Sequence, residues 1–327
     1  MKIFVLRIIS LFLITAVSFS CSTNNSTQSP KENLTQTTRS PEKYRIVKHA
    51  MGTTKIIGKP QRIVVLTNEA TDLVLALGIK PVGAVKSWSG DPYFDYIASD
   101  MAGVMVIGDE FQPNLEKIVI LKPDLIIGSK IRQQQIYRRL AAIAPTVFSE
   151  TIGVTWKDNL KLYAEALDRQ QEAEKITNNW HQRVANFKAK LENRKVPEIS
   201  LVRFAPGMTR VYYKKSFPGQ IIEEVGLKRP ETQNKNKFAE ELGLESIPDL
   251  DADIMFYFTY DSGNNKGKKV ELKWLQHPLW KTLKVIQNER AYQVNDVYWT
   301  TSGGVQSANK VLDDLYLYIL EEQKYSN

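Results

Sequence analysis

Short, mainly apolar segments alternate with helix-like segments along most of this chain, and no other feature of the sequence restricts the fold as strongly. The apolar segments lie at residues 63–66, 81–85, 125–127, 146–148 and 199–202. A strand that is apolar on both sides is buried on both faces of its sheet. The alternation therefore predicts parallel sheets that are covered by helices on both faces.

The helix-like segments carry ordinary end signals. Residues 69–77 have helical spacing and end at Gly78, and residues 115–121 end before Pro123. Glycine readily adopts the backbone conformation that closes a helix, and proline does not continue one. A further helix is predicted at residues 133–141.

Residues 157–194 have a different composition, because they contain neither glycine nor proline. Apolar side chains recur there at spacings of three and four, which gives a helix with one apolar face. At about 1.5 Å per residue such a helix is about 30 Å long, enough to run from one lobe to another. Trp156, at its head, is predicted to be a core residue. The apolar face consists of Ala173, Ile176, Trp180, Val184, Phe187 and Leu191.

Beyond this helix the alternation resumes, with helices at residues 219–225 and 305–320 and strands at residues 254–258 and 291–294. A chain of 327 residues is too long for one ordinary core. We therefore expect an α/β fold of two Rossmann-like lobes joined by a long α-helix. The predicted parts are an N-terminal lobe at 43–156, connecting helices at 157–194 and a C-terminal lobe at 195–327.

Residues 1–20 are predicted to be a signal peptide. Lys2 and Arg7 accompany an apolar run at residues 8–17, and a run of this length is too short to cross a bilayer, which takes about 20 residues. Residues 21–42 are predicted to be a tether, because a segment rich in Ser, Thr, Asn and Gln cannot bury enough apolar surface to fold. The protein is therefore expected to be exported.

Cys21, the chain's one cysteine, begins that tether and has no partner for an internal disulfide. The arrangement resembles a bacterial lipoprotein, which is cleaved before the cysteine and lipidated on its sulfur. This resemblance implies a protein of the periplasm or cell envelope that is anchored to the membrane through Cys21. Ser18 and Phe19 stand where a Leu and a smaller residue are usual, and ordinary secretion is the alternative.

Six segments resemble the helical-backbone substrate-binding proteins of bacterial ABC importers, the class III periplasmic binding proteins, which bind ferric siderophores, cobalamin or haem. The resemblance runs from about Tyr44 to the C-terminus and is greatest for the ferric-siderophore branch. It implies a binding protein, not an enzyme, that captures a ferric siderophore of citrate-hydroxamate or hydroxamate type in an interlobe cleft. A haem or cobalamin receptor of the same fold is the alternative. The segments are "RIVVLTNEATDLVLALGIKPVGAV", "PNLEKIVILKPDLIIGS", "IAPTV", "GQIIEEVGLKRP", "LESIPDLDADIMF" and "WTTSGGVQSANKVLDDL".

The same resemblance implies docking on an inner-membrane permease, which works with its ATPase, through one glutamate on each lobe. The matching positions are Glu116 in "PNLEKI" and Glu245 in "LESIPDL". Two exposed carboxylates can pair with permease arginines and fix the orientation of docking. The alternative is that each is an ordinary surface glutamate at the start of a helix.

Candidate ligand-binding residues follow the predicted strands, because ligands of open α/β sheets bind outside the carboxyl ends of the strands. Arginine suits an oxygen-rich chelate, since its planar fork pairs with carboxylate or hydroxamate oxygens. Tyr298 and Trp299 precede a Gly-rich turn at residues 300–304, where a helix N-terminus favours an anion. The candidates are Trp88, Lys130, Arg132, Arg203, Arg210, Tyr298 and Trp299.

Each candidate has an alternative role. Arg203 or Arg210 can be tied to a core carboxylate such as Glu223 or Glu224, and Lys130 and Arg132 can be solvated charges at a helix start. Trp88 and Trp299 can pack between the lobes.

Residues 109–112, Asp-Glu-Phe-Gln, stand where some relatives carry an arginine. Loss of a positive charge there disfavours a highly anionic chelate such as ferric dicitrate, and favours a mixed citrate-hydroxamate ligand of lower charge.

Other functions find little support. The 44 Lys and Arg exceed the 36 Asp and Glu by eight, which favours anionic partners, but the basic residues are dispersed, so nucleic-acid binding is not expected. The three histidines, His49, His181 and His277, are scattered, and we expect no protein-bound metal or cofactor. The sequence has no Gly-x-Ser-x-Gly elbow or P-loop, so we expect no catalytic residues. A monomer is expected.

Overall fold

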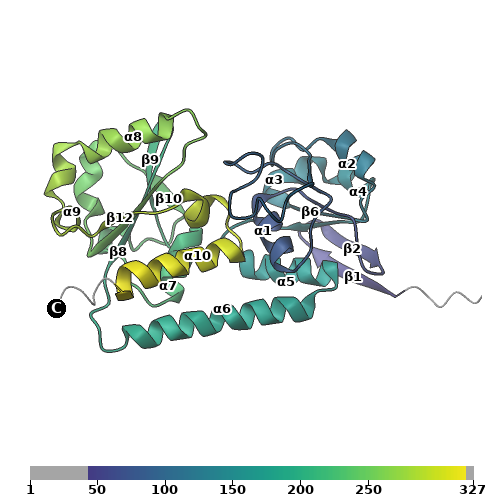
Figure 1. Ribbon diagram of the computed structural model, residues 1–327, viewed down its shortest axis with the longest axis horizontal. Helices are drawn as coiled ribbons and strands as arrows, with labels where there is room; N and C mark the ends of the chain where they lie inside the picture. The colour runs from purple at the N-terminus through teal and green to yellow at the C-terminus, as the bar shows by residue number, and fades with distance from the viewer. Residues whose placement is uncertain (1–42, 322–327) are drawn as a thin grey trace, which may run out of the picture. The chain divides into compact units, whose positions relative to one another are not determined.

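The computed structural model describes residues 43–321, and all of them belong to one unit of the chain (Figure 1). The predicted signal peptide, the tether and Cys21 therefore lie outside the described residues. No helix in the described part of the chain is both long and apolar enough to cross a membrane.

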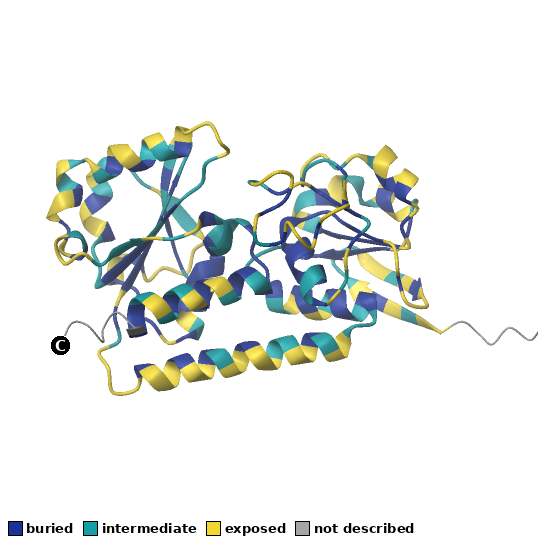
Figure 2. Ribbon diagram, viewed as in Figure 1, coloured by how far each residue is buried: buried dark blue, intermediate teal, exposed yellow. Residues whose placement is uncertain are grey.

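The sheet of the N-terminal lobe is wholly parallel, as the sequence predicts, with the strand order β5-β4-β3-β6-β7. Every residue of its central strands is buried, which matches their apolar composition (Figure 2). The strands are β3 (Ile63–Val65), β4 (Gly83–Ala84), β5 (Met105–Val106), β6 (Leu125–Ser129) and β7 (Thr146–Ser149).

Two helices of this lobe begin at side-chain caps that the sequence supplies. Thr67 caps α1 (Asn68–Ala76), and Asn114 caps α2 (Leu115–Leu121), whose bounds agree with the prediction. The helix predicted at residues 133–141 is instead three short pieces, which begin directly after β6. They are α3 (Lys130–Gln133), a 3-10 turn (Gln134–Ile136) and α4 (Tyr137–Ala141).

The sheet of the C-terminal lobe is mixed, with the order β10-β9-β8-β11-β12. Its parallel pairs join β8 to β11 and β11 to β12, whereas β8 and β9 form an antiparallel hairpin at Pro206-Gly207. The sheet of this lobe is therefore not wholly parallel, because a two-residue turn cannot make the long crossover that a parallel pair requires. The strands are β8 (Ile199–Ala205), β9 (Met208–Tyr212), β10 (Ala239–Glu241), β11 (Ile254–Thr259) and β12 (Ala291–Gln293).

The helices of the C-terminal lobe cover this sheet and close the described chain. They are α7 (Phe217–Glu224), α8 (Lys266–Leu275), α9 (Lys284–Gln287) and α10 (Val305–Leu315). Short 3-10 helices span Glu231–Gln233, Leu244–Leu250 and Pro278–Thr282, and π-helical segments span Val297–Thr301 and Tyr316–Glu321.

The connecting segment contains two helices, α5 (Trp156–Leu167) and α6 (Gln170–Leu191). They are separate because Asp168 adopts a left-handed backbone with φ of 59°, which ends α5. The 22 residues of α6 make it about 33 Å long. Its predicted apolar face is buried at every position except Ile176, which is partly buried.

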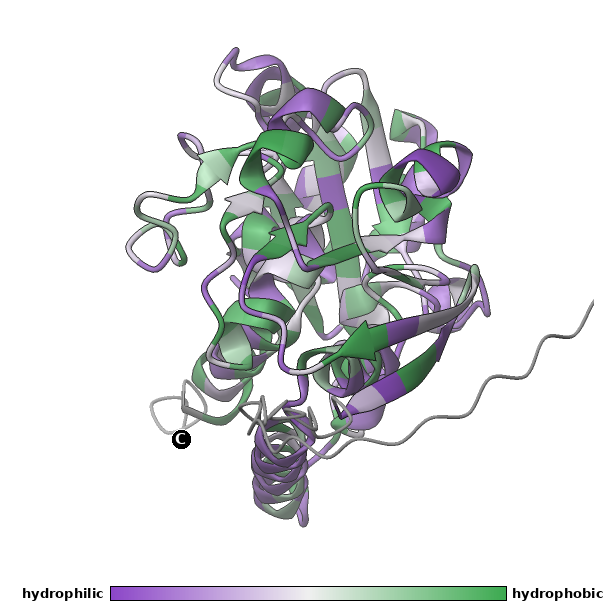
Figure 3. Cartoon of the chain, turned by 90° about the vertical axis from the view of Figure 1, so that its right-hand side faces the viewer, coloured by the Kyte–Doolittle hydropathy of each residue, from purple (hydrophilic) through white to green (hydrophobic). Residues whose placement is uncertain are grey.

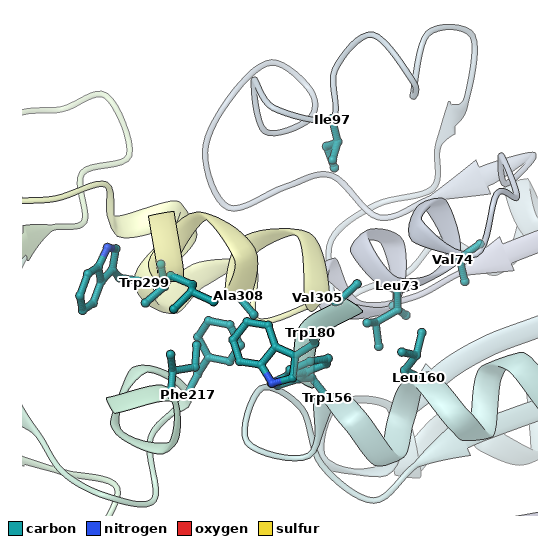
Figure 4. Packing of buried hydrophobic residues seen from close by; sticks show 14 of the residues in the cluster. Leu73, Val74, Ile97, Trp156, Leu160, Trp180, Phe217, Trp299, Val305 and Ala308 are labelled. Carbon is teal, nitrogen blue, oxygen red and sulfur yellow. The ribbon is translucent and has the colours of Figure 1, made fainter. Parts of the chain in front are cut away.

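One apolar core runs through both lobes and the connecting helices. Leu73 of α1, Trp156 of α5 and Trp180 of α6 belong to the same buried cluster as Phe217 of α7 and Val305 of α10 (Figure 4). The rings of Trp156 and Trp180 meet edge to face, with centroids 5.3 Å apart. The prediction of Trp156 as a core residue is confirmed, since it is 3% exposed.

The first two strands, β1 (Tyr44–His49) and β2 (Gly52–Ile57), were not predicted from the sequence; they form an antiparallel hairpin. Val47 and Ile56 on its inner face are buried. The Thr54 hydroxyl donates a hydrogen bond of 2.8 Å to the Thr146 carbonyl at the start of β7, which fixes the hairpin to the N-terminal lobe.

Candidate ligand-binding site

Residues of both lobes line one cavity of about 530 Å³, which is within the usual size range for small-molecule sites. Most of the lining follows the carboxyl ends of strands, as expected for an α/β fold. The lining residues are Glu69, Trp88, Glu110, Arg132, Ile152, Gly153, Val154, Arg203, Ala205, Pro206, Met208, Tyr212, Phe217, Pro218, Phe238, Tyr260, Thr300, Thr301, Ser302 and Gly303.

Arg203 lies near the end of β8 and lines the cavity, where it forms a two-point ion pair with Asp296. Its Nε and Nη2 donate to the two carboxylate oxygens of Asp296 at 2.6 and 2.9 Å. Nη2 also donates to Thr301 Oγ1 at 3.2 Å, and Nη1 donates to the Tyr212 hydroxyl at 3.2 Å. Because a guanidinium has five N–H donors, one donor on Nη1 is left for a ligand.

Asp296 is a different partner from Glu223 and Glu224, the two core carboxylates that the sequence suggested for Arg203. Glu223 pairs with Lys214, and Glu224 pairs with Lys157 and accepts a hydrogen bond from the Trp180 indole. The Asp296 carboxylate raises the pKa of Arg203 further above its already high ordinary value, although burial acts in the opposite direction. Arg203 is therefore a fixed positive charge at the cavity wall.

Arg132 is the corresponding arginine of the N-terminal lobe, on α3 just beyond β6. Its Nε donates to Glu110 Oε2 at 2.9 Å, and its guanidinium lies 5.1 Å from the centre of the Phe111 ring. The side chain is 26% exposed, and no other hydrogen bond of its guanidinium is made within the described part of the chain. Arg132 thus keeps four N–H donors for a ligand.

Glu110, the partner of Arg132, is also held by a second residue. Its Oε1 accepts hydrogen bonds of 2.7 Å from both the backbone and the side-chain nitrogen of Asn68, at the start of α1. The residue is 1% exposed and lines the cavity. Residues 109–112, where some relatives carry an arginine, therefore place a carboxylate in the cavity wall.

Glu69 is a second buried carboxyl group in the cavity wall. It accepts hydrogen bonds from Asn159 Nδ2 at 2.6 Å and from the backbone nitrogen of Gly153. Burial raises the pKa of Glu69 to about 8, against the lowering effect of these hydrogen bonds, and Asp72 and Glu110 raise it further. The Glu69 carboxyl is therefore mostly protonated and uncharged at neutral pH.

Arg210 lies directly opposite Arg203 in the β8–β9 hairpin. Directly opposed residues of an antiparallel pair project from the same face of the sheet. Met208 and Tyr212, its neighbours on that face, line the cavity, but Arg210 itself does not. Its side chain makes no ion pair or hydrogen bond within the described part of the chain, so its guanidinium stays available.

Aromatic side chains surround the two cavity arginines. Trp88 packs edge-on against Phe111, with ring centroids 5.4 Å apart, and the Tyr260 ring lies 5.3 Å from the Arg203 guanidinium. The Tyr260 hydroxyl donates to the Trp88 carbonyl at 3.3 Å, which links the two lobes at the cavity. Phe238 also lines the cavity, although it is 53% exposed.

The remaining three candidates lie outside the cavity lining. Trp299 is fully buried, packs at a tilt against Phe256 with centroids 4.7 Å apart, and donates its indole N–H to Asp314, so it belongs to the core (Figure 4). Tyr298 packs edge-on against Tyr96 of the N-terminal lobe. Lys130 pairs with Glu150 at 2.7 Å.

The helix N-terminus after the Gly-rich turn does hold an anion, and this anion is the protein's own Asp72. Its carboxylate accepts hydrogen bonds of 2.9 and 3.1 Å from the backbone nitrogens of Gln306 and Ser307, in the first turn of α10. It also accepts a hydrogen bond of 2.6 Å from the Tyr96 hydroxyl. Burial nevertheless raises the pKa of Asp72 to about 6. Asp72 therefore caps a helix of one lobe from a helix of the other.

The two docking candidates are exposed on separate lobes. Glu116 is in the first turn of α2, and Glu245 is in the first turn of the 3-10 helix Leu244–Leu250. Neither carboxylate has a hydrogen-bond or ion-pair partner among residues 43–321. Both are thus available to a partner protein.

Several lining residues were not predicted. Tyr260 directly follows β11, so the strand-end rule that selected Arg132 also applies to it. Glu69 and Glu110 reach the cavity only because α1 and the segment before α2 converge, which no local pattern shows. The described residues include no group of three or more His, Cys, Asp or Glu side chains that could hold a metal ion.

Two α/β lobes that share one cavity, with an arginine from each lobe held by a buried carboxylate, define a two-lobed ligand-binding protein. Residues 63–298 match the model of the family described as "Periplasmic binding protein". The chain belongs to this periplasmic binding protein family, and its lobes and connecting helices have the class III fold.

Individual relatives agree with this assignment. The chain is 50% identical to the "Probable siderophore-binding lipoprotein YfiY" of Bacillus subtilis, over 86% of this chain and 90% of that protein. It is 36% identical to the "Achromobactin-binding periplasmic protein" of Dickeya dadantii, over 78% and 85% of the two chains. The crystal structure of Staphylococcus aureus SirA complexed with staphyloferrin B superposes with a TM-score of 0.78 at 38% identity, over 84% of this chain and 98% of that one.

Proposed function

We propose that this protein is the substrate-binding component of an ABC importer and that it captures a ferric siderophore in the cavity between its lobes. The observation that supports this most directly is the pair of arginines, Arg132 and Arg203, that reach one cavity from opposite lobes. The oxygens of a siderophore can accept hydrogen bonds from the free N–H groups of these arginines. The siderophore itself coordinates the iron, so no metal ligand from the protein is needed. The relative that is 50% identical, named as a probable siderophore-binding lipoprotein, supports the same substrate class.

The charge balance of the site supports a chelate of low net charge. Arg132 and Arg203 are each paired with a carboxylate, and Glu69 is mostly uncharged at neutral pH. The cavity thus offers directional donors with little net positive charge. A mixed citrate-hydroxamate or a hydroxamate siderophore suits such a site better than a highly anionic chelate.

The cavity favours a siderophore over haem. No histidine is among the described residues that line it. The hydroxyl of Tyr212 accepts a hydrogen bond from Arg203, and the hydroxyl of Tyr260 donates one to Trp88. Both tyrosine hydroxyls in the cavity lining therefore already have a hydrogen-bond partner within the protein.

We further propose that lipid on Cys21 anchors the protein in the cell envelope, and that Glu116 and Glu245 dock it on the permease. Mass spectrometry of the membrane fraction tests the first part. An unmodified Cys21 in a soluble protein contradicts the anchor and leaves siderophore capture unaffected.

The decisive experiment is a titration followed by tryptophan fluorescence, because Trp88 lines the cavity. Ferric citrate, ferric hydroxamates, ferric citrate-hydroxamates, ferric catecholates, haem and cobalamin are added separately. Saturable quenching by a ferric citrate-hydroxamate or hydroxamate is expected. Saturable binding of haem with a shifted Soret band, and of no ferric siderophore, contradicts the proposal.

A further inference from the structure

The outer face of the β1–β2 hairpin is both apolar and basic. Tyr44, Ile46 and Ile57 on this face are 57%, 53% and 55% exposed. These three are among eleven large hydrophobic residues that are exposed within residues 43–321, and no other strand pair carries as many. The facing pairs that make up the outer face are Tyr44 with Ile57, Ile46 with Lys55 and Lys48 with Thr53.

The hairpin cannot turn this face inward, because its other face is held by the N-terminal lobe. Val47 and Ile56 are buried there, and Arg45 Nη2 donates a hydrogen bond of 2.7 Å to the Ala166 carbonyl at the end of α5. Side chains alternate between the two faces of a strand, so the outer positions point away from the lobe. Figure 3, which views the molecule from the side of the hairpin, shows hydrophobic and hydrophilic segments along it.

The segment that carries this face has no negative charge. Residues 43–62 contain Lys43, Arg45, Lys48, Lys55, Lys59 and Arg62 and no Asp or Glu. Lys55 Nζ lies 4.3 Å from the centre of the Tyr44 ring, and neither Lys48 nor Lys55 pairs with a carboxylate within residues 43–321. Apolar side chains bordered by unpaired lysines are suited to the boundary between headgroups and acyl chains, where lysine tails extend toward phosphate.

The hairpin is also the part of the described chain nearest in sequence to the proposed anchor. Lys43, the first described residue, is 22 positions after Cys21. The tether that the composition of residues 21–42 predicts would have a root-mean-square span of about 26 Å and would reach only about 75 Å when fully extended. Tethering of this kind gives an effective concentration in about the millimolar range, so a weak surface contact is well populated.

We infer that the outer face of the β1–β2 hairpin is a membrane-contact surface that binds anionic phospholipid headgroups. Tyr44, Ile46 and Ile57 enter the interface, and Lys48 and Lys55 pair with lipid phosphates. The inference rests on the proposed membrane anchoring, since the tether brings the hairpin to the bilayer.

Vesicle flotation tests the contact without the anchor. The chain from residue 21 onward, with Cys21→Ser so that it carries no lipid, is mixed with phosphatidylglycerol vesicles or with phosphatidylcholine vesicles at low ionic strength. Flotation with phosphatidylglycerol and much less with phosphatidylcholine is expected. Absence of flotation with phosphatidylglycerol overturns the inference.

Two sets of variants locate the contact. The triple variant Tyr44→Thr/Ile46→Thr/Ile57→Thr puts a residue of high β-propensity at each position, and we expect its partition to fall at least about fivefold. Lys48→Thr/Lys55→Thr should lower the partition about tenfold or more, and added salt should reduce this difference. The matched controls on α8, Leu272→Thr and Lys269→Thr/Lys273→Thr, should float like the parent chain.

Other results contradict the inference. Equal flotation of the triple variant and the parent chain overturns it. A parent chain that sediments as a dimer, with the dimer lost in the triple variant and no vesicle binding, shows an interface between copies instead. Siderophore affinity, measured on the same variants, should not change, so a failure of the proposed ligand is seen separately from a failure of the membrane contact.

Discussion

Arg132 and Arg203 reach the cavity from opposite lobes, and each holds a carboxylate before any ligand arrives. This pairing fixes the direction of the free N–H groups, so a ligand does not have to order a flexible side chain. Each arginine therefore has two separable effects. Its ion pair with the buried carboxylate contributes to the stability of the fold, and its free N–H groups contribute to ligand affinity.

Arg132→Ala should weaken ferric siderophore binding about 10- to 100-fold, since a charge-assisted hydrogen bond contributes about 1.5–3 kcal/mol. It should also lower the free energy of unfolding, because Glu110, which is 1% exposed, loses its positive partner. Adding Glu110→Gln should restore stability and leave the affinity low. Fluorescence titration and urea denaturation measure the two effects, and recovery of affinity in the double variant contradicts the role of Arg132.

Arg203→Ala and Arg210→Ala form a matched pair, because the two arginines face each other on one side of the same hairpin. Arg203→Ala leaves Asp296 buried without its partner and should cost about 3 kcal/mol of stability. Arg210→Ala should change stability by no more than about 0.5 kcal/mol, since Arg210 has no partner in the described structure. Both should lower ligand affinity, and an unchanged affinity in Arg210→Ala removes it from the site.

Glu69 should make stability depend on pH. Burial raises its pKa from an ordinary value of 4.5 to about 8, so between these values the folded state binds the proton more tightly than the unfolded state. This stabilisation is complete below the lower value and is lost as the pH rises through the upper one. Glu69→Gln should remove that part of the slope and leave a constant offset from the altered hydrogen bonds.

Urea denaturation at pH values below, within and above this window measures the Glu69 effect. Glu174→Gln, which changes an exposed glutamate on α6, is the control and should keep the slope of the parent protein. A Glu69→Gln variant with the parent slope contradicts the raised pKa.

Asp72 caps the N-terminus of helix α10, whereas the sequence around α10 suggests that this N-terminus is available to an anionic ligand. The Gly-rich turn and the helix start were visible as an anion site, but the anion comes from α1, more than two hundred residues earlier. The strand-end rule also selected Arg132 and Arg203, and both line the cavity. It failed for Trp299, because the π-helical segment Val297–Thr301 turns that indole into the core. Local pattern thus located the elements, and packing between them determined which side chains reach the cavity.

Asp72→Ala should lower both stability and ligand affinity, because it removes the cap that joins α1 to α10. Loss of a helix cap costs about 0.5–2 kcal/mol. The control is Asn114→Ala, which removes the cap of α2 within one lobe and should lower stability by a similar amount with no change in affinity. Thermal unfolding and titration of both variants measure these effects. Equal affinities for the two variants contradict a role of Asp72 in positioning the lobes.

The molecule as a whole is held together by a core that passes from the N-terminal lobe through α5 and α6 into the C-terminal lobe. The amphipathic pattern of residues 173–191 predicted that α6 is buried along one face, and the structure confirms it. The β1–β2 hairpin could not be predicted in the same way, since its outer face carries Tyr44, Ile46 and Ile57, which hide the usual alternation of apolar and polar residues. A surface that contacts a partner carries exposed apolar residues, which break the alternation that a purely solvent-exposed strand face shows.

The proposed docking on the permease belongs to the scale of the whole molecule, because it would use one glutamate from each lobe. Glu116→Gln/Glu245→Gln should abolish most uptake of radioactive ferric siderophore by cells and leave ligand affinity unchanged, since both carboxylates are exposed and outside the cavity lining. Each single variant should retain part of the uptake, because one charge-assisted pair remains. The control Glu174→Gln/Glu192→Gln removes two exposed carboxylates, one on α6 and one directly after its last residue, and should transport normally. Normal uptake by the Glu116→Gln/Glu245→Gln variant would show that the permease recognises another surface.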